Sequence, residues 1–454
     1  MLKDGEKIIY ETESLCPVCL KKIPASRVKR GEDVYFIKNC PEHGKFDTIL
    51  WRGKPYYEDW VRETEKVLPK KTITESVRGC PFDCGVCSAH EQQACCVLLE
   101  VTQRCNQHCF YCFANAEAEK AQDPSMEEIR QWYQMLLDIG EDRPFNIQLS
   151  GGEPTVRDDL SEIIRLGKSM GFPYIQLNTN GKRLAEDVHY VEELKNAGLS
   201  AVFLQFDGTT DGIYERLRGQ KLLKQKEKAI ENCEKNQLGV VLVPTLVPGV
   251  NTDNIGEIIR FAVERLPAVR GVHFQPVSYF GRYPDAPGDS QRITLPEVMA
   301  EIEKQTGGEI PIGAFQPQMT GNPLCSFHGS FVYMEDRGIV SIGGTAGSCK
   351  CQGNNEDAII KARDFVAKKW TRAEKTACCG TGISDSLSDF DRYIERVQDY
   401  GFSISGMAFQ DIWNLDLERL RRCKIHVMNV DKRVIPFCAF NLTDQQGNPL
   451  YRGR

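Results

Sequence analysis

Residues 97–112 read VLLEVTQRCNQHCFYC and join a strand signal to a cysteine loop. Val97–Thr102 is a short, largely apolar run typical of a buried strand. Three cysteines follow at once with C-x3-C-x2-C spacing: Cys105, Cys109 and Cys112. A short loop of this kind can wrap three thiolates around a cubane cluster that needs four ligands, which leaves one iron open. Zinc and ferredoxin sites share the string, so spacing alone leaves both alternatives open.

The strand-then-helix pattern continues beyond this loop. Further apolar, β-branched runs occur at Phe145–Gly151, Tyr174–Gly181, Ala201–Gly208, Gly239–Leu246 and Gly271–Ser278. Segments with helical periodicity separate them, which indicates parallel strands joined by crossover helices. Six such units are fewer than the eight of a closed barrel, so we predict an α/β fold with a partial (β/α)6 barrel. A doubly wound open sheet is the alternative, and either fold gathers its chemistry at the C-terminal ends of the strands.

Polar residues follow several of these predicted strands. The second strand ends in SGGEP, residues 150–154, where Gly151 and Gly152 allow backbone to approach a ligand closely and Glu153 offers an acceptor. A glycine turn with a helix cap is the alternative explanation. The remaining candidates at strand ends are Asn178, Asn180, Gln205, Asp207 and Gln275. Their recurrence at strand ends favours a binding site over isolated hydrogen-bonding residues.

The cysteine loop and the SGGEP segment together resemble the radical S-adenosylmethionine (SAM) superfamily, and Tyr111 just before Cys112 also fits that loop. The resemblance implies that SAM chelates the open iron of a 4Fe-4S cluster. It also implies reductive cleavage of SAM to a 5′-deoxyadenosyl radical, which abstracts hydrogen from an unactivated carbon. Glu153 would face the SAM ammonium group, Asn178 and Asn180 its carboxylate and ribose, and Asp207 the ribose or the substrate.

A second cysteine group precedes the barrel. Cys80, Cys84 and Cys87 repeat the C-x3-C-x2-C spacing. With Cys95 as the fourth thiolate, or Cys96 in its place, they would close an auxiliary 4Fe-4S cluster. A zinc site is the alternative, and His90 could replace a thiolate.

Two short knuckles near the start carry another set of ligands. Cys16 and Cys19 form one, and Cys40 and His43 form the other. Such loops bring four ligands around a tetrahedral ion, either zinc or a rubredoxin-like mononuclear iron, with no obvious open position. We therefore predict a structural metal site.

Seven cysteines lie after residue 310. We expect four of them to hold a second auxiliary cluster: Cys325, Cys349, Cys423 and Cys438. The adjacent pair Cys378 and Cys379 cannot easily serve one cubane, so a redox-active or substrate-facing thiol pair is the hypothesis there.

These features divide the 454 residues into four expected parts: a knuckle domain (1–75), an auxiliary-cluster segment (76–96), the barrel (97–310) and a C-terminal iron–sulfur domain (311–454). A formal charge of −6 argues against a nucleic-acid partner. No run of about 18 apolar residues predicts a membrane span, and the charged N-terminus has no apolar signal segment. We expect a soluble cytoplasmic protein.

The order of these motifs resembles one branch of the superfamily. That branch holds the tetraether lipid synthases, also described as 7,8-dihydro-6-hydroxymethylpterin dimethyltransferases, and bacterial relatives, some of them selenoproteins. This chain departs from archaeal members at Gly406 and Ala408, where those tend to have Cys and His, which affects the C-terminal cluster. The resemblance implies C–C bond formation or methylation of a lipid, pterin or peptide, with ferredoxin or flavodoxin as reductant. The alternatives are a peptide-modifying maturase and an iron–sulfur electron carrier.

Overall fold

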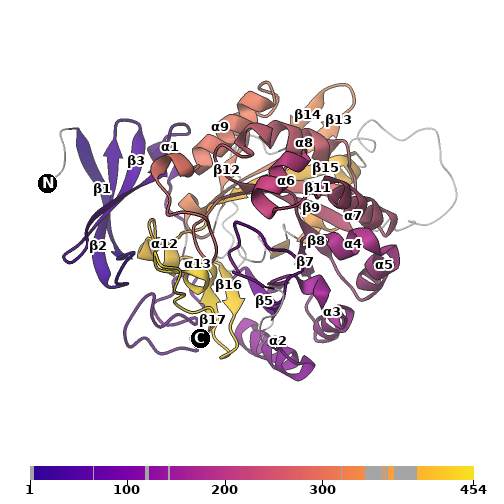
Figure 1. Ribbon diagram of the computed structural model, residues 1–454, viewed down its shortest axis with the longest axis horizontal. Coiled ribbons are helices and arrows are strands. Elements are labelled where there is room, and N and C mark those ends of the chain that lie inside the picture. Colours follow the sequence, from indigo (N-terminus) through magenta and orange to yellow (C-terminus); the bar gives the residue numbers. More distant parts are fainter. Residues whose placement is uncertain are drawn as a thin grey trace.

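The computed structural model describes residues 5–64, 66–117, 122–141, 144–318, 320–342, 360, 363–364, 367–372 and 396–453. A small N-terminal sheet lies beside a larger α/β body (Figure 1). In the described part of the chain, no helix is both long enough and apolar enough to cross a membrane.

The N-terminal sheet is an antiparallel meander. Its strands, paired in sequence order, are β1 (Glu6–Leu15), β2 (Lys22–Arg30), β3 (Asp33–Cys40) and β4 (Gly44–Trp51), and helix α1 (Tyr57–Trp60) follows. Residues alternate between buried and exposed along β3, as expected for a strand with one covered face. Val34 and Trp51 from this face pack in the same hydrophobic core as the barrel strands. The sheet is therefore fixed to the body.

The six predicted barrel strands are all present. They are β5 (Cys96–Thr102), β6 (Asn146–Gly151), β7 (Ile175–Thr179), β8 (Ala201–Gln205), β9 (Gly239–Val243) with its extension β10 (Thr245–Leu246), and β11 (Val269–Pro276). Each pairs in parallel with its neighbour in the order of the sequence. Their carboxyl ends consequently meet at one edge of the sheet, and polar residues placed there become neighbours.

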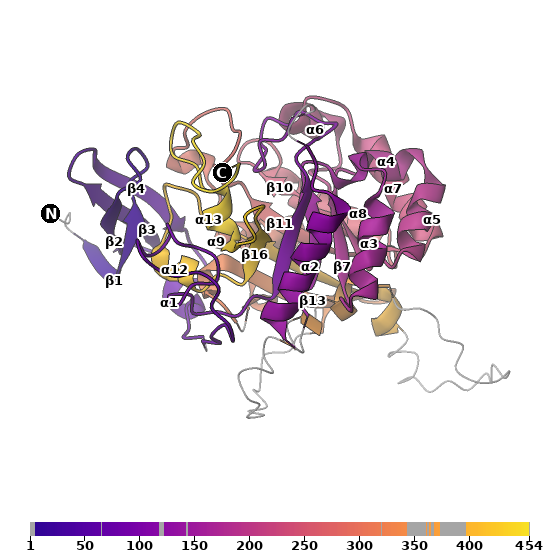
Figure 2. The same cartoon turned by 90° about the horizontal axis from the view of Figure 1, so that it is seen from below.

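Helices cover the outer face of this sheet (Figures 1 and 2). They are α2 (Met126–Gly140), α3 (Leu160–Ser169), α4 (Lys182–Glu186), α5 (Val188–Asn196), α6 (Asp211–Arg218), α7 (Leu223–Lys235), α8 (Ile255–Val263) and α9 (Leu295–Gln305). Helix α2 shows why: Ile129, Trp132 and Leu136 recur at helical spacing and are buried, and Ser125 with Glu128 forms a capping box at its start.

The C-terminal residues extend both edges of the same sheet. Near β11 lie β12 (Gln316–Pro317), β13 (Ser326–Met334), β14 (Gly338–Ser341) and β15 (Gly401–Met407). Beyond β5 lie α12 (Leu417–Arg421), β16 (Ile425–Met428), β17 (Val434–Pro436) and α13 (Phe437–Asn441). Strand β15 runs parallel to β11 and β16 parallel to β5, so the expected separate domain contributes strands to the barrel sheet. Among the described residues no pairing joins β12 to β17, and the barrel stays open as predicted.

Candidate active site and metal centres

The N-terminal sheet brings its four predicted ligands together. The ligand atoms of Cys16, Cys19, Cys40 and His43 all lie within 4.8 Å of one another. Cys19 Sγ is 3.9 Å from Cys40 Sγ, and His43 Nδ1 is 3.6 Å from Cys16 Sγ and 3.5 Å from Cys40 Sγ. A tetrahedral ion with Zn–S bonds of about 2.3 Å separates its sulfurs by about 3.8 Å. The donor set therefore fits a metal ion.

The electrostatics of this site favour a thiolate. Burial acts to raise the pKa of Cys40, but hydrogen bonds from His43 and from backbone N–H groups overcome it and lower the pKa to about 6. Thiolate is the form that ligates metal.

The three cysteines of the central loop lie just beyond the end of β5 and are partly buried. Backbone hydrogen bonds fasten the loop: Cys112 and Arg282 exchange two of 2.9 Å, and the Cys105 N–H donates to Glu117 O at 3.1 Å. Burial, then the charge of Glu153, raises the pKa of Cys105 to about 12, and the nearby thiols of Cys109 and Cys112 act in the same direction. The loop thus brings the three thiols to one place, where a bound cation would favour their ionised form.

The two glycines of the SGGEP segment approach the chain that leads into this loop. A Cβ on Gly151 would lie 2.0 Å from Thr102 O, and one on Gly152 would lie 2.1 Å from Arg104 O. The Gly152 and Glu153 N–H groups donate to Thr102 O and Arg104 O, each at 2.8 Å. In this structure the glycines are therefore required for contact between two backbone segments.

The Glu153 carboxylate is buried and lines the central cavity. One oxygen accepts hydrogen bonds from Thr155 N at 3.1 Å and from Thr179 Oγ1 at 2.6 Å. The other accepts from Asn180 N at 2.6 Å. Glu153 consequently joins the second and third strand ends beside the cysteine loop.

One cavity, of about 580 Å³, connects most of the predicted site residues. Its wall includes the three loop cysteines, Tyr111, Gly151, Gly152, Glu153, Asn178, Asn180, Gln205 and Gln275. It also reaches Cys96, Asn146 and Tyr174 at the start of the barrel strands, so it runs along the barrel interior. Asp207 is not among the lining residues, because its fully buried carboxylate pairs with Arg218.

Two buried cations near this site were missed in the sequence. Arg218 bonds to Asp207 and to the cysteine loop. Lys226 Nζ donates to Asn180 O at 2.5 Å and Gln205 Oε1 at 3.1 Å, and burial lowers its pKa to about 8. Each lies on a helix that also carries exposed basic residues, Arg216 on α6 and Lys224, Lys228 and Lys235 on α7, so the sequence gives no sign of burial.

The first predicted auxiliary group lies in the segment before the barrel. The Cys80 thiol hydrogen-bonds Cys84, and Cys87 lies close enough to act on the pKa of Cys84. Cys95 lines the central cavity together with Cys96 and the half-buried Lys424. Its assignment as fourth ligand of the first group remains a prediction. His90 Nε2 lies 2.9 Å from Cys423 O, to which it donates.

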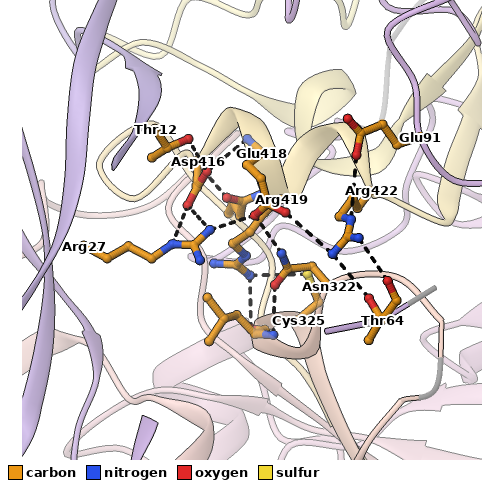
Figure 3. Close-up of polar contacts among 12 residues, drawn as sticks. Thr12, Arg27, Thr64, Glu91, Asn322, Cys325, Asp416, Glu418, Arg419 and Arg422 are labelled. Atoms are coloured by element: carbon orange, nitrogen blue, oxygen red, sulfur yellow. Dashed lines mark hydrogen bonds and ion pairs between the residues drawn. The ribbon is translucent and has the colours of Figure 1, made fainter. Parts of the chain in front are cut away.

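Cys325, Cys423 and Cys438 gather near Arg419. Arg419 Nη2 donates to Cys325 Sγ at 3.5 Å, with the bond shown in Figure 3. Cys325 and Cys423 both act on the pKa of Cys438, which burial raises. Four further thiols of the C-terminal group lie outside the described residues: Cys349, Cys351, Cys378 and Cys379.

Comparisons with known families match both parts of this arrangement. The family described as the Radical SAM superfamily matches residues 99–262, and the HMPTM N-terminal zinc ribbon domain matches residues 8–52. The first range begins within β5 and includes the cysteine loop and SGGEP. The second includes all four ligands of the N-terminal site.

Relatives extend the similarity to nearly the whole chain. The 7,8-dihydro-6-hydroxymethylpterin dimethyltransferase of Methanocaldococcus jannaschii is 36% identical, over 96% of this chain and 94% of that protein. A probable GTP 3′,8-cyclase of Pyrococcus abyssi is 34% identical, over 36% of this chain and 51% of its own length.

Solved structures overlap only part of the chain. One is hexahistidine-tagged anSMEcpe with bound AdoMet, at 17% identity and a TM-score of 0.38, covering 46% of this chain and 58% of that one. Another is methylornithine synthase (PylB), at 15% identity and a TM-score of 0.37, covering 47% and 62%. The family assignment therefore depends on the sequence matches and on the site geometry. The chain is a radical SAM enzyme and belongs to the family of the 7,8-dihydro-6-hydroxymethylpterin dimethyltransferase, with an N-terminal zinc ribbon.

Proposed function

We propose that this enzyme abstracts hydrogen from an unactivated carbon of a small organic substrate, and that this carbon then takes a methyl group from a second SAM, which leaves as S-adenosylhomocysteine, with one further electron from the external reductant. C–C coupling is the alternative outcome. One observation carries the proposal. The three-cysteine loop, the SGGEP segment and the third strand end all meet at the wall of one cavity large enough for SAM and a substrate.

The residues present fit a cluster with an open iron. The loop offers three thiols, and neighbouring polar groups that line the same cavity offer acceptors and donors for an amino acid moiety: Glu153, Asn178 and Asn180. A 4Fe-4S cluster bound there supplies the electron that cleaves SAM to methionine and the 5′-deoxyadenosyl radical. Our assignment gives Cys105, Cys109 and Cys112 the role of ligands and gives Glu153 the SAM ammonium group.

The barrel interior supports a substrate with a polar, planar edge. Amide side chains on adjacent strands form a hydrogen-bonded row: Gln176 Nε2 donates to Asn178 Oδ1 at 2.8 Å, and Asn178 Nδ2 donates to Gln148 Oε1 at 3.4 Å. Apolar and aromatic groups complete the wall, among them Phe203, which lies 4.7 Å from the Trp370 ring. A reduced pterin, the substrate class in the relative's name, combines a flat ring with amide-like donors and acceptors and is our first candidate substrate.

Auxiliary 4Fe-4S clusters are part of the proposal. The group at Cys80, Cys84 and Cys87 and the group at Cys325, Cys423 and Cys438 each supply three thiols. Clusters at these places would relay electrons or position the substrate. An acidic electron carrier such as ferredoxin or flavodoxin is the expected reductant.

The test is an anaerobic assay of the reconstituted full chain with SAM and dithionite, with and without a dihydropterin. 5′-Deoxyadenosine and S-adenosylhomocysteine are measured together. The matched control changes Cys105, Cys109 and Cys112 to Ala while leaving the zinc ribbon intact, and its zinc content reports correct folding.

We expect 5′-deoxyadenosine from the wild type and none from the triple variant. Pterin-dependent S-adenosylhomocysteine with a methylated product supports the substrate assignment. Absence of 5′-deoxyadenosine from protein fully loaded with iron and sulfide would refute the proposed reaction. If 5′-deoxyadenosine forms without any change to the pterin, the pterin assignment is wrong.

A further inference from the structure

Arg218, at the end of α6, makes a two-point ion pair inside the protein. Its Nε donates to Asp207 Oδ2 at 2.8 Å and its Nη2 to Asp207 Oδ1 at 2.7 Å, and both side chains are buried. Thr245 adds two bonds, since its N–H donates to Asp207 Oδ1 and its Oγ1 accepts from Arg218 Nη2, each at 3.2 Å. A planar guanidinium held at two points has a fixed orientation.

The opposite edge of this guanidinium faces the cysteine loop. Nη1 donates to Tyr111 O at 3.0 Å, and the Arg218 charge lies close enough to the Cys109 thiol to act on its pKa, in the lowering direction. A backbone bond of 3.1 Å from Phe110 N to Leu217 O joins the same two segments. The end of α6 therefore bonds two successive residues of the loop, Phe110 and Tyr111, and its guanidinium lies near the Cys109 thiol.

Stability alone does not explain this pair. Burying two charges costs desolvation, so a buried ion pair is weak evidence for a gain in folding free energy. Capping of α6 does not require Arg218 either, because Gly219 takes a left-handed conformation (φ +76°) and its N–H donates to Glu215 O. The guanidinium edge that faces the loop places a positive charge near a ligand thiol, which has a more specific consequence.

We propose that Arg218, oriented by Asp207, is a positioning residue for the SAM-site cluster. It fixes the segment between Cys109 and Cys112 and places a positive charge beside the Cys109 sulfur. The inference rests on the proposed function, because it concerns the same three-cysteine site. One-electron reduction of a cluster adds negative charge, and a cation near a ligand sulfur stabilises the reduced state. Arg218 therefore makes the cluster easier to reduce.

The experiment compares reconstituted full-length variants by redox titration with EPR detection. The SAM-site cluster is identified as the signal that changes when SAM is added. The test variants are Arg218→Gln, Arg218→Lys and Asp207→Asn. The control is Arg216→Gln on the same helix, because Arg216 is exposed and its guanidinium bonds Gly249 O at 2.8 Å.

The expected shifts have opposite signs. Arg218→Gln moves the midpoint potential of the SAM-site cluster to a more negative value. Asp207→Asn moves it to a less negative value, because the guanidinium is then uncompensated. Arg218→Lys keeps the charge and stays closer to wild type than Arg218→Gln, while Arg216→Gln leaves the potential unchanged. A merely structural role predicts loss of iron without these signed shifts.

An unchanged potential in Arg218→Gln at full iron content overturns the inference. If the Arg218→Gln variant does not bind the cluster, the midpoint potential of Asp207→Asn is the test instead. An unchanged potential in Asp207→Asn also overturns the inference. A wild-type chain whose cluster signals never respond to SAM counts against the proposed function itself. A SAM response with no shift in the variants counts only against the role of Arg218.

Discussion

At the scale of single residues, Gly152 is the position where the backbone leaves no room for a side chain. Replacement by Ala places a Cβ 2.1 Å from Arg104 O, a main-chain atom that cannot rotate away. We expect Gly152→Ala to displace the segment that leads into Cys105 and to cost about 1–3 kcal/mol, the usual cost of overpacking. Iron content at the SAM site should fall while zinc in the ribbon is retained, which metal analysis measures.

Gly212→Ala is the matched control for Gly152→Ala. Gly212 lies in α6, and nothing lies within 4 Å of a Cβ built there. Helix propensity predicts a gain of up to about 1 kcal/mol from this change. Equal iron content in both alanine variants would contradict the tight approach seen at Gly152.

The buried Glu153 carboxylate accepts hydrogen bonds from both the Asn180 N–H and the Thr179 hydroxyl. In Glu153→Gln the amide –NH₂ group cannot accept, so one buried donor loses its partner, at a cost of about 1–3 kcal/mol. We expect lower stability and weaker SAM binding, measured by chemical unfolding and by equilibrium dialysis of SAM. Glu162→Gln on the exposed face of α3 should change neither.

The residue scale also shows what the sequence could predict. The cysteine loop (residues 105–112) and the SGGEP segment (150–154) are recognisable because each motif is contiguous. In the structure the loop follows β5 and the segment lies at the end of β6, as predicted. Arg218 was missed because its partners are distant: Asp207 lies 11 positions away and Tyr111 lies 107 away. Nothing in RLRGQK, residues 216–221, distinguishes the buried arginine from its exposed neighbour Arg216. Only the packing of α6 against the loop makes that distinction.

At the scale of elements, an ion pair joins the N-terminal sheet (β1–β4) to helix α12 near the C-terminus. Arg27 on β2 donates to Asp416 Oδ2 through Nε at 2.9 Å and Nη2 at 2.6 Å, as Figure 3 shows. Asp416 is fully buried and also accepts from the Thr12 hydroxyl and from the Glu418 N–H in the first turn of α12. One carboxylate thus links β1, β2 and α12.

Asp416→Asn should therefore destabilise the protein strongly. The change leaves the Arg27 charge buried with reduced compensation, which typically costs about 3–5 kcal/mol. Chemical unfolding of the metal-loaded chain measures the loss. Glu58→Gln removes the partner of Lys29 in an exposed pair of the same region and should cost less than about 1 kcal/mol. Similar losses in the two variants would show that the Asp416 contact contributes little to joining the sheet and α12.

Elements differ in how well the sequence predicts them. All six barrel strands were found because each is an apolar run bounded by turns, with helical periodicity between them. The strands β15 and β16 were not placed in the sheet, since their partners, β11 and β5, are more than 100 residues away. Pairing at that distance depends on which sheet edges are free, and a local pattern carries no information about it.

At the scale of the whole molecule, the open barrel encloses polar groups along its length. β13 and β15 place His328, Ser403 and Ser405 against the cavity, and β11 adds His273. Burial lowers the pKa of His273, His328 and the more distant His90 to about 4 each. A ring that stays neutral in the folded state but titrates near pH 6.5 in the unfolded chain makes stability depend on pH.

The direction of this pH dependence follows from the number of protons that His273 binds in the folded and unfolded states. Between pH 6.5 and about 4 the unfolded chain binds the proton and the folded chain does not, so folding loses stability as the pH falls through that window. The expected contribution of His273 between pH 7 and pH 5 is about 2 kcal/mol. His273→Gln should keep a bond to Ser405 Oγ, which lies 2.8 Å from His273 Nδ1, and should lose less stability on acidification.

Urea unfolding of wild type and His273→Gln at pH 7, 6 and 5 tests this, because acid effects on the metal thiolates are common to both chains and cancel in the difference. His189→Gln serves as the control, since the His189 side chain is 88% exposed. We expect the urea midpoints of wild type and His273→Gln to converge, or to change order, as the pH falls. Parallel pH profiles would mean that His273 takes up its proton inside the folded barrel. The interior would then be hydrated enough to accept a charged group, which would favour a charged substrate over the neutral pterin ring.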